Sequence, residues 1–293
     1  MERLTQNTWF AVLVVVSAII LIWYGFSIQL NMPWQRGVYA RAGEDGVPLL
    51  QLLSDLWSQQ RPVLPAPHQV AVEFWNSVFL ANPSTPRSLI FHAWITLSAT
   101  GLGFLFGTLL GIFLAVLIVH NRAVDRSLMP WVIASQTIPI LAIAPMVVVV
   151  LNSVGLTGLI PKALISTYLS FFPVVVGMVK GFRSPDALQL DLMRTYSASG
   201  AQMFWKLRWP SALPFLFTSM KVGVAASLVG AIVGELPTGA AGGLGSRLLA
   251  GSYYGQTTQI WAALFMAAAL SAALIFAISA VQKLTQKAMG APA

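Results

Sequence analysis

Long apolar runs are the feature that most constrains what this chain can fold into. Of its 293 residues, 57% are hydrophobic and only 9% are charged, whereas a soluble domain carries about 25% charged residues. A membrane-spanning helix needs roughly 20 apolar residues, and the sequence holds about six runs of that length. The composition excludes an ordinary soluble domain and a disordered chain. It predicts an all-α membrane protein with about six transmembrane helices.

The six expected spans follow from these runs. They cover residues 9–28, 91–119, 129–151, 161–179, 214–234 and 259–280. Prolines inside the third and fourth runs predict kinks, because neighbouring helices can satisfy the carbonyl groups that a proline frees. In the second run Gly103, Gly107 and Gly111 recur every four residues. That spacing favours the close approach of another helix.

The spans divide the chain into four parts. Residues 1–28 are expected to form a cytoplasmic tail and the first span, and residues 29–90 an extracytoplasmic or interfacial segment. Prolines in that segment limit its helices to short amphipathic stretches. Residues 91–280 are expected to form a five-helix core that includes the cytoplasmic loop 181–213, and residues 281–293 a cytoplasmic tail.

Basic residues set the expected orientation. With a cytoplasmic N-terminus, the four inside segments hold ten Lys and Arg residues, and the three outside segments hold five in more positions. Cytoplasmic loops carry an excess of Lys and Arg, so both termini are expected in the cytoplasm. The same rule accounts for the net charge of +8 without a nucleic-acid partner.

The loop 181–213 is too structured in composition to be a simple connection. Ser184 and Pro185 suggest a helix cap and first turn, and Gly200 can end a helix over 187–199. Aromatic and basic residues over 203–209 predict a second short helix. From composition alone this loop is either a membrane-surface helix or a rigid docking element for a soluble partner.

The same loop carries a resemblance to a known family. The sequence Asp191-Leu192-Met193-x3-Ser197, followed by the run 204–214, resembles the cytoplasmic EAA loop of ABC importer permeases. The fit is to the binding-protein-dependent group for nitrate, sulfonate, taurine, thiamine precursors and riboflavin. Either Ser197 or Gly200 stands at the Gly position of that loop. The segments 64–67, 136–145 and 230–245 are similar to further motifs of the group, in the same order.

The resemblance implies the type I ABC importer permease fold with a cytoplasmic coupling helix. It also implies a bacterial inner-membrane location, a second permease copy, an extracytoplasmic solute-binding protein and a separate ATP-binding subunit. This chain would be no enzyme and hold no cofactor, with ATP bound by the partner subunit. The residues implied to contact that subunit are Asp191, Arg194, Thr195, Tyr196, Ser197, Ala198, Ser199 and Gly200.

The resemblance leaves the solute open within its group. Phe204-Trp205-Lys206 and the residues around Glu235 look most like members linked to heterocyclic compounds, such as thiamine pyrimidines or riboflavin. Sulfonate, taurine and nitrate stay possible.

Two polar residues are candidates for the translocation pathway. Glu235 is the only acidic residue after Asp191, and an acidic group at membrane depth is a functional candidate. Its structural alternatives are pairing with Arg247 or capping residues 238–243. Gln136 is the second candidate, and its alternative is a hydrogen bond between helices. Glu235 also defines an alternative function, a proton-coupled secondary transporter.

Motifs for catalysis are absent from the sequence. It contains no G-x4-G-K-[ST] phosphate loop, no G-x-S-x-G, no H-E-x-x-H and no cysteine. His68, His92 and His120 lie in different segments, so no metal site is expected. Energy for transport must therefore come from another chain or from an ion gradient, and a membrane enzyme or scaffold is the least supported alternative.

Overall fold

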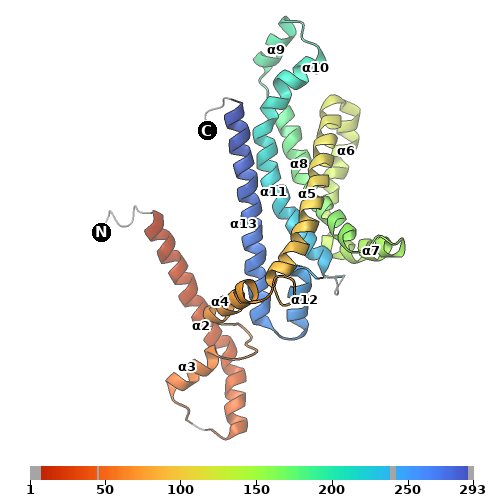
Figure 1. Ribbon diagram of the computed structural model, residues 1–293. Helices are drawn as coiled ribbons and strands as arrows, with labels where there is room; N and C mark the ends of the chain where they lie inside the picture. The colour runs from red at the N-terminus through yellow and green to blue at the C-terminus, as the bar shows by residue number, and fades with distance from the viewer. Residues whose placement is uncertain (1–7, 45, 238–241, 290–293) are drawn as a thin grey trace. The chain divides into compact units, whose positions relative to one another are not determined.

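The computed structural model describes residues 8–44, 46–237 and 242–289, and all regular secondary structure in those ranges is helical. The long helices are α2 (Thr8–Ala42), α5 (Leu89–His120), α8 (Leu159–Phe182), α11 (Trp209–Glu235) and α13 (Thr257–Ala288), as labelled in Figure 1. The shorter helices include α3 (Leu49–Trp57), α4 (Pro67–Trp75), α6 (Arg122–Ala134), α7 (Ile140–Ser153), α9 (Ala187–Thr195), α10 (Gly200–Met203) and α12 (Leu244–Tyr253). Two π-helical turns, η1 (Asn76–Leu80) and η3 (Phe204–Arg208), and one 3₁₀ turn, η2 (Ser135–Thr137), complete the described elements. The chain forms two compact units, the first of Met1–Phe91 with Arg247–Met266 and the second of His92–Ser246 with Ala267–Ala293.

Membrane-spanning length is reached by five helical runs in the described residues. They are Trp9–Ala42, Leu89–His120, Leu159–Phe182, Gly200–Glu235 and Thr257–Ala288. A sixth crossing results if α6 and α7 act as one broken span. The all-α membrane fold with about six spans is therefore confirmed.

The predicted third span, 129–151, is not one helix. After α6 and η2 the chain bends by 98° into α7. Ile138, the residue before Pro139, is extended with φ −84° and ψ 122°, because the ring of the following proline disfavours a helical backbone there. The hydroxyl of Tyr168 in α8 donates a hydrogen bond to the carbonyl of Ser135 at the bend. Pro139 thus breaks this span where the sequence predicted only a kink, whereas Pro130 and Pro145 lie inside α6 and α7.

In the first unit, α2 runs through Pro33 to Ala42, past the predicted end at residue 28. Polar side chains four residues apart on this extension bind the segment 55–64. The Asn31 amide donates to the Leu64 carbonyl (2.9 Å), Gln59 donates to Gln35 (2.9 Å), and the Tyr39 hydroxyl donates to Asp55 (2.6 Å). These long-range bonds stabilise the extension, and the sequence pattern around Pro33 could not show them.

At the centre of the second unit, helix α8 packs closely against both α5 and α11. A Cβ atom on Gly103 of α5 would lie 2.7 Å from the carbonyl oxygen of Ala163 in α8. One on Gly230 of α11 would lie 2.7 Å from the Cα atom of Ser166. The glycine spacing in the second span therefore marks close helix packing, as the sequence indicated. The Ser166 hydroxyl donates to the Ser227 carbonyl (2.9 Å) across the second contact.

Candidate functional site

Helix α9 stands at one end of the second unit, beyond the ends of α8 and α11 (Figure 1). Asp186 caps it: its carboxylate accepts a hydrogen bond from the next backbone amide (2.7 Å), and its own amide donates to Gln189 Oε1 (3.1 Å). Such reciprocal bonds satisfy amides that a first helical turn leaves free. The predicted cap at Ser184 is wrong, because the Ser184 hydroxyl donates to the Gly181 carbonyl at the end of α8 (2.7 Å).

The helix ends in a tight turn at Ser197. With a φ of 51°, Ser197 is the one non-glycine residue in the described ranges that has a positive φ. Glycine adopts that conformation most readily, and Ser197 is one of the two residues that the sequence allowed at the Gly position of an EAA-like loop. The predicted helix end at Gly200 is wrong. Gly200 instead begins α10, which Ser199 caps by accepting a hydrogen bond from the Gln202 amide (3.3 Å).

The face of α9 carries an apolar stripe that nothing in the described part of the chain covers. Leu188, Leu192 and Tyr196 lie four residues apart and therefore share one face of the helix. Their exposed fractions are 78%, 56% and 78%, and no residue of α9 is buried. A stripe of this kind is a contact surface for a partner or a membrane. Leu188 was missed by the sequence analysis, although its four-residue spacing to Leu192 and Tyr196 was the available signal.

All eight residues implied to contact an ATP-binding subunit lie together on α9, the turn after it and the start of α10. Seven are exposed and Ala198 is half-buried. Asp191 and Arg194 form an ion pair of 2.9 Å, in which both side chains are mostly exposed. An exposed pair contributes about 0–1 kcal/mol, so Arg194 can exchange Asp191 for an acidic group of a partner at little cost.

A stiff connection joins this segment to the membrane helices. The run Gly200–Glu235 passes without a break from α10 through η3 into α11. The predicted second short helix over 203–209 is therefore the start of the fifth span rather than a separate element. The buried ring of Phe204 packs against Phe182 at the end of α8 (centroids 5.3 Å apart) and His120 at the end of α5 (5.2 Å).

Glu235, the second candidate, is fully buried at the end of α11. Its Oε1 atom accepts a hydrogen bond from the Thr96 hydroxyl (2.8 Å), and Oε2 accepts one from the Gly245 amide (2.7 Å). Gly245 lies in the first turn of α12, where a carboxylate is favoured by the free amides and the helix dipole. This arrangement is close to the capping alternative, although residues 238–241 lie outside the described residues. Glu235 thus ties α5 and α11 to the start of α12.

Arg247, the other proposed partner of Glu235, belongs to the first unit. Burial lowers the pKa of its guanidinium group, and the negative charge of Glu73, in the same unit, opposes that change. Because an arginine pKa lies far above neutrality, Arg247 stays charged.

Lys162 and His92 extend the polar cluster around Glu235. Lys162 of α8 is only 2% exposed, and its Nζ atom donates to the Gly242 carbonyl (3.2 Å). His92 Nδ1 accepts a hydrogen bond from the Gly243 amide (3.0 Å). A Cβ atom on Gly243 would overlap the Glu235 carboxylate, so only a glycine at this position lets the backbone pass this close to the carboxylate. The sequence analysis missed Lys162, Thr96 and His92 in this role, because their partners are distant in sequence.

Gln136 lies exposed in η2, between α6 and α7. Its amide donates a hydrogen bond of 3.3 Å to the adjacent Ser135 hydroxyl. The bond between helices that was considered for it is not seen in the described residues. Its position at a broken span leaves a role in the pathway as a prediction.

Comparisons with known proteins match this architecture. Residues 107–290 match a family described as "Binding-protein-dependent transport system inner membrane component". A probable ABC transporter permease protein of Haemophilus influenzae is 30% identical over 228 residues, which cover 78% of this chain and 88% of that protein. The formylaminopyrimidine transport permease protein ThiX of Halalkalibacterium halodurans is 32% identical over 225 residues, which cover 76% of this chain and 83% of that protein. The riboflavin transport system permease protein RibX of Chloroflexus aurantiacus is 31% identical over 183 residues, which cover 61% of this chain and 63% of that protein.

A solved structure shares the fold. A chain of the MetNI methionine ABC transporter, in an inward-facing conformation, matches with a TM-score of 0.59 at 20% identity. The match covers 67% of this chain and 95% of that chain.

Proposed function

Since the chain belongs to the family of inner membrane components of binding-protein-dependent transport systems, we propose that it imports a heterocyclic solute by coupling to an ATP-binding subunit through α9. As a member of this family, the chain is a membrane permease of an ABC importer for small solutes, and it is not an enzyme. The family match includes the whole segment 181–213.

The exposed stripe of α9 and its connection to α11 support the coupling proposal. α9 is a capped helix with no buried residue and an uncovered apolar stripe, and the turn 196–199 joins it to the continuous helical run Gly200–Glu235. A membrane-surface helix would satisfy the stripe but would leave the stiff connection without a use. Docking of the stripe into a groove of an ATP-binding subunit uses both features, because a stiff element transmits a displacement that a flexible loop would absorb. The turn at Ser197 supports placing that residue at the Gly position of the loop.

The assembly follows from the same proposal. The permease would pair with a second copy, bind an ATP-binding subunit at α9 and receive its solute from an extracytoplasmic binding protein. Both termini and α9 would lie in the cytoplasm. In support, the C-terminal end of α13 and α9 lie at the same end of the second unit (Figure 1).

The solute class is proposed from relatives. The permeases named for formylaminopyrimidine and riboflavin are 32% and 31% identical to this chain. Those named for aliphatic sulfonates and nitrate are 24% and 25% identical. A heterocyclic solute is therefore favoured.

Uptake should separate this function from proton-coupled transport by Glu235. In cells that also carry the ATP-binding subunit and the binding protein, we expect riboflavin or formylaminopyrimidine uptake to depend on ATP and to persist with an uncoupler. Glu235→Gln keeps one acceptor oxygen for Thr96 but places an amide against the Gly245 amide. It should cost about 1–3 kcal/mol of stability, the cost of a poorly satisfied buried group, and leave uptake dependent on ATP.

A control variant at the same carboxylate, and the result expected of secondary transport, complete this test. Thr96→Val, which removes the hydroxyl donor at the same carboxylate, should lower stability similarly without changing the energy source. Uptake that stops with the uncoupler while cellular ATP is maintained, and that Glu235→Gln abolishes in a stably folded protein, would establish secondary transport instead.

A further inference from the structure

An apolar cavity of about 290 Å³ lies inside the second unit, between α5, α7 and α8. This volume is near the lower end of the range of roughly 300–1,000 Å³ that is usual for small-molecule sites. The hydroxyl of Thr167 donates to the Ala163 carbonyl (2.8 Å), and that of Tyr168 donates to the Ser135 carbonyl. The two hydroxyls are thus engaged elsewhere, and the walls present apolar surface. The lining residues are Leu110, Ile140, Ile143, Val147, Leu164, Ile165, Thr167, Tyr168 and Phe171.

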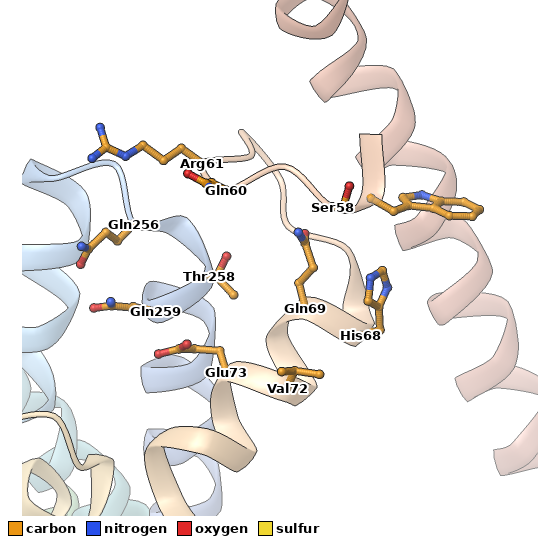
Figure 2. A pocket seen from close by; sticks show the side chains of 11 residues that line it. Ser58, Gln60, Arg61, His68, Gln69, Val72, Glu73, Gln256, Thr258 and Gln259 are labelled. Carbon is orange, nitrogen blue, oxygen red and sulfur yellow. The ribbon is translucent and has the colours of Figure 1, made fainter. Parts of the chain in front are cut away.

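A larger cavity in the first unit has the opposite character. Its volume is about 490 Å³, and Figure 2 shows the side chains of Gln60, Arg61 and Glu73 among those around it. Gln60 and Arg61 are exposed, so water satisfies their polar groups and nothing there selects a ligand. The apolar cavity of the second unit is therefore the one to consider as a solute site.

The apolar cavity adjoins the break between α6 and α7. Ile140, the first residue of α7, lines the cavity, and Tyr168 binds Ser135 on the other side of the break. Pro139 has no amide hydrogen for the Ser135 carbonyl, and the Tyr168 hydroxyl satisfies this carbonyl instead. Tyr168 lies about 14 Å from the start of α8 and about 21 Å from its end, at 1.5 Å per residue. The break therefore lies inside the hydrocarbon core of the bilayer, which is about 30 Å thick.

A break at this depth is not compatible with a lipid environment. Gln136, Thr137 and Ile138 are exposed, and no described residue covers them. Non-helical backbone at membrane depth is tolerated only where protein buries it or where it lines a water-filled cavity. The side-chain carbonyl of Gln136 accepts no hydrogen bond within the described residues, so it requires water or a solute. These features favour an aqueous pathway at the break.

The charges near the break disfavour an anionic solute. Lys162 is the only charged residue from 127 to 179, and its Nζ atom already donates to the Gly242 carbonyl (3.2 Å). An anion that leaves water without a counter-charge is costly at membrane depth. A neutral ring can instead place its face against an apolar wall and leave the polar groups of its edge for Gln136.

We propose that the break and the adjoining cavity form a contact site for a neutral, planar heterocycle inside the translocation pathway. The ring enters the cavity beside Tyr168 and Phe171, whose ring centroids are 6.1 Å apart. The Gln136 amide, which both donates and accepts, bonds to the edge of the ring. The Thr137 hydroxyl donates to the Ala134 carbonyl (2.8 Å) and keeps an acceptor for the solute. This site rests on the import function proposed above and names a solute contact within it.

Water access at the break can be measured without any solute. The chain contains no cysteine, so a single introduced cysteine reports its own surroundings. In membrane fragments, where a charged thiol reagent reaches both sides, Thr137→Cys should react more than about tenfold faster than Leu105→Cys, because lipid excludes a charged reagent. Slow reaction at both positions would overturn the proposal, since the break would then face lipid or protein.

Leu105 is a control of matched depth. It is 53% exposed and lies about 22 Å from His120, as Tyr168 lies about 21 Å from Phe182. The ends of α5 and α8 meet at Phe204, so the two positions share a level. Leu105 is two residues from Gly103, which contacts α8, and therefore points away from α8.

Uptake tests the cavity itself. In cells that carry the ATP-binding subunit and the binding protein, Ile143→Trp should fill the cavity and lower uptake of formylaminopyrimidine or riboflavin about tenfold or more, because a packed space does not accept further atoms. Gln136→Leu should lower it about fivefold, the value of an ordinary hydrogen bond. ATP hydrolysis should continue in both variants, since α9 is unchanged. Leu141→Trp, at an exposed position of α7 outside the cavity, should transport normally.

The outcomes separate this site from the import function. Normal uptake by Ile143→Trp, in a protein that elutes as a folded species, would overturn the site and leave import by the permease intact. Equal losses in Ile143→Trp and Leu141→Trp would also overturn it, because the effect would then belong to α7 as a whole. Absence of uptake of both probes by the wild-type transporter would contradict the proposed function and, with it, the solute class.

Discussion

Tyr196→Ala is expected to reduce ATP-driven uptake by more than tenfold while the protein inserts and folds normally. The Tyr196 side chain is 78% exposed and makes no hydrogen bond or ring contact within the described residues, so its removal should change stability little. In an interface with an ATP-binding subunit it would be a buried aromatic anchor, and such anchors cost about 2 kcal/mol or more when truncated. Uptake and ATP hydrolysis, measured in the same proteoliposomes, should show that hydrolysis persists but no longer drives import.

Tyr253→Ala is the matched control for this experiment. Tyr253 is a tyrosine of equal exposure, 79%, at the end of α12 and outside the coupling segment. It should retain a normal ratio of uptake to ATP hydrolysis. Ser199→Trp, which places a bulky ring at the cap of α10, should reproduce the uncoupling. If Tyr196→Ala and Ser199→Trp both transport normally, α9 is not the docking element.

Gly103→Leu is expected to destabilise the permease by about 3 kcal/mol, the upper range for overpacking a core. The new side chain would meet the backbone of α8, since its Cβ atom would lie 2.7 Å from the Ala163 carbonyl and 3.0 Å from the Thr167 amide. Backbone atoms cannot turn aside as a flexible side chain can, so α5 and α8 must separate. Thermal unfolding in detergent and the monodisperse fraction after size-exclusion chromatography measure the loss.

Gly101→Leu provides the control two residues away on the same helix. A Cβ atom at Gly101 would meet nothing within 4 Å, and replacing glycine in a helix adds about 0.5–1 kcal/mol of stability. The Gly101 variant should therefore equal or exceed the wild-type protein in stability. Similar losses for the two variants would mean that lipid contact, rather than the α5–α8 packing, determines the effect.

The sequence predicted those parts of the fold that depend on local pattern. Apolar length located the membrane helices, and the glycine spacing at 103, 107 and 111 located a close helix contact, because both signals reside in neighbouring residues. The sequence did not predict features of the fold that depend on contacts between residues distant in the chain. The hydrogen bonds of Asn31, Gln35 and Tyr39 to the segment 55–64 extend α2 through Pro33, and no pattern near Pro33 contains that information.

The same difference between local patterns and long-range contacts applies to the candidate site. The segment 181–213 was recognisable because its residues are contiguous, but the ends of its first helix were predicted at the wrong residues. Asp186, not Ser184, caps the start of α9, and Ser197, not Gly200, adopts the positive φ of the turn that follows the helix. For the buried cluster, Glu235 could be found as a lone acidic residue near a membrane helix. Its partners Thr96 and Lys162 come from helices far away in sequence, so only the folded chain reveals them.

Docking of an ATP-binding subunit on α9 can be tested by co-purification. The tagged permease, extracted gently from its native host, should elute with an ATP-binding subunit at equal stoichiometry. Replacing residues 191–200 by a Gly/Ser linker should remove that subunit while the permease still elutes as a folded species. A permease that elutes alone and transports in proteoliposomes under a proton gradient would contradict the account and direct attention to Glu235.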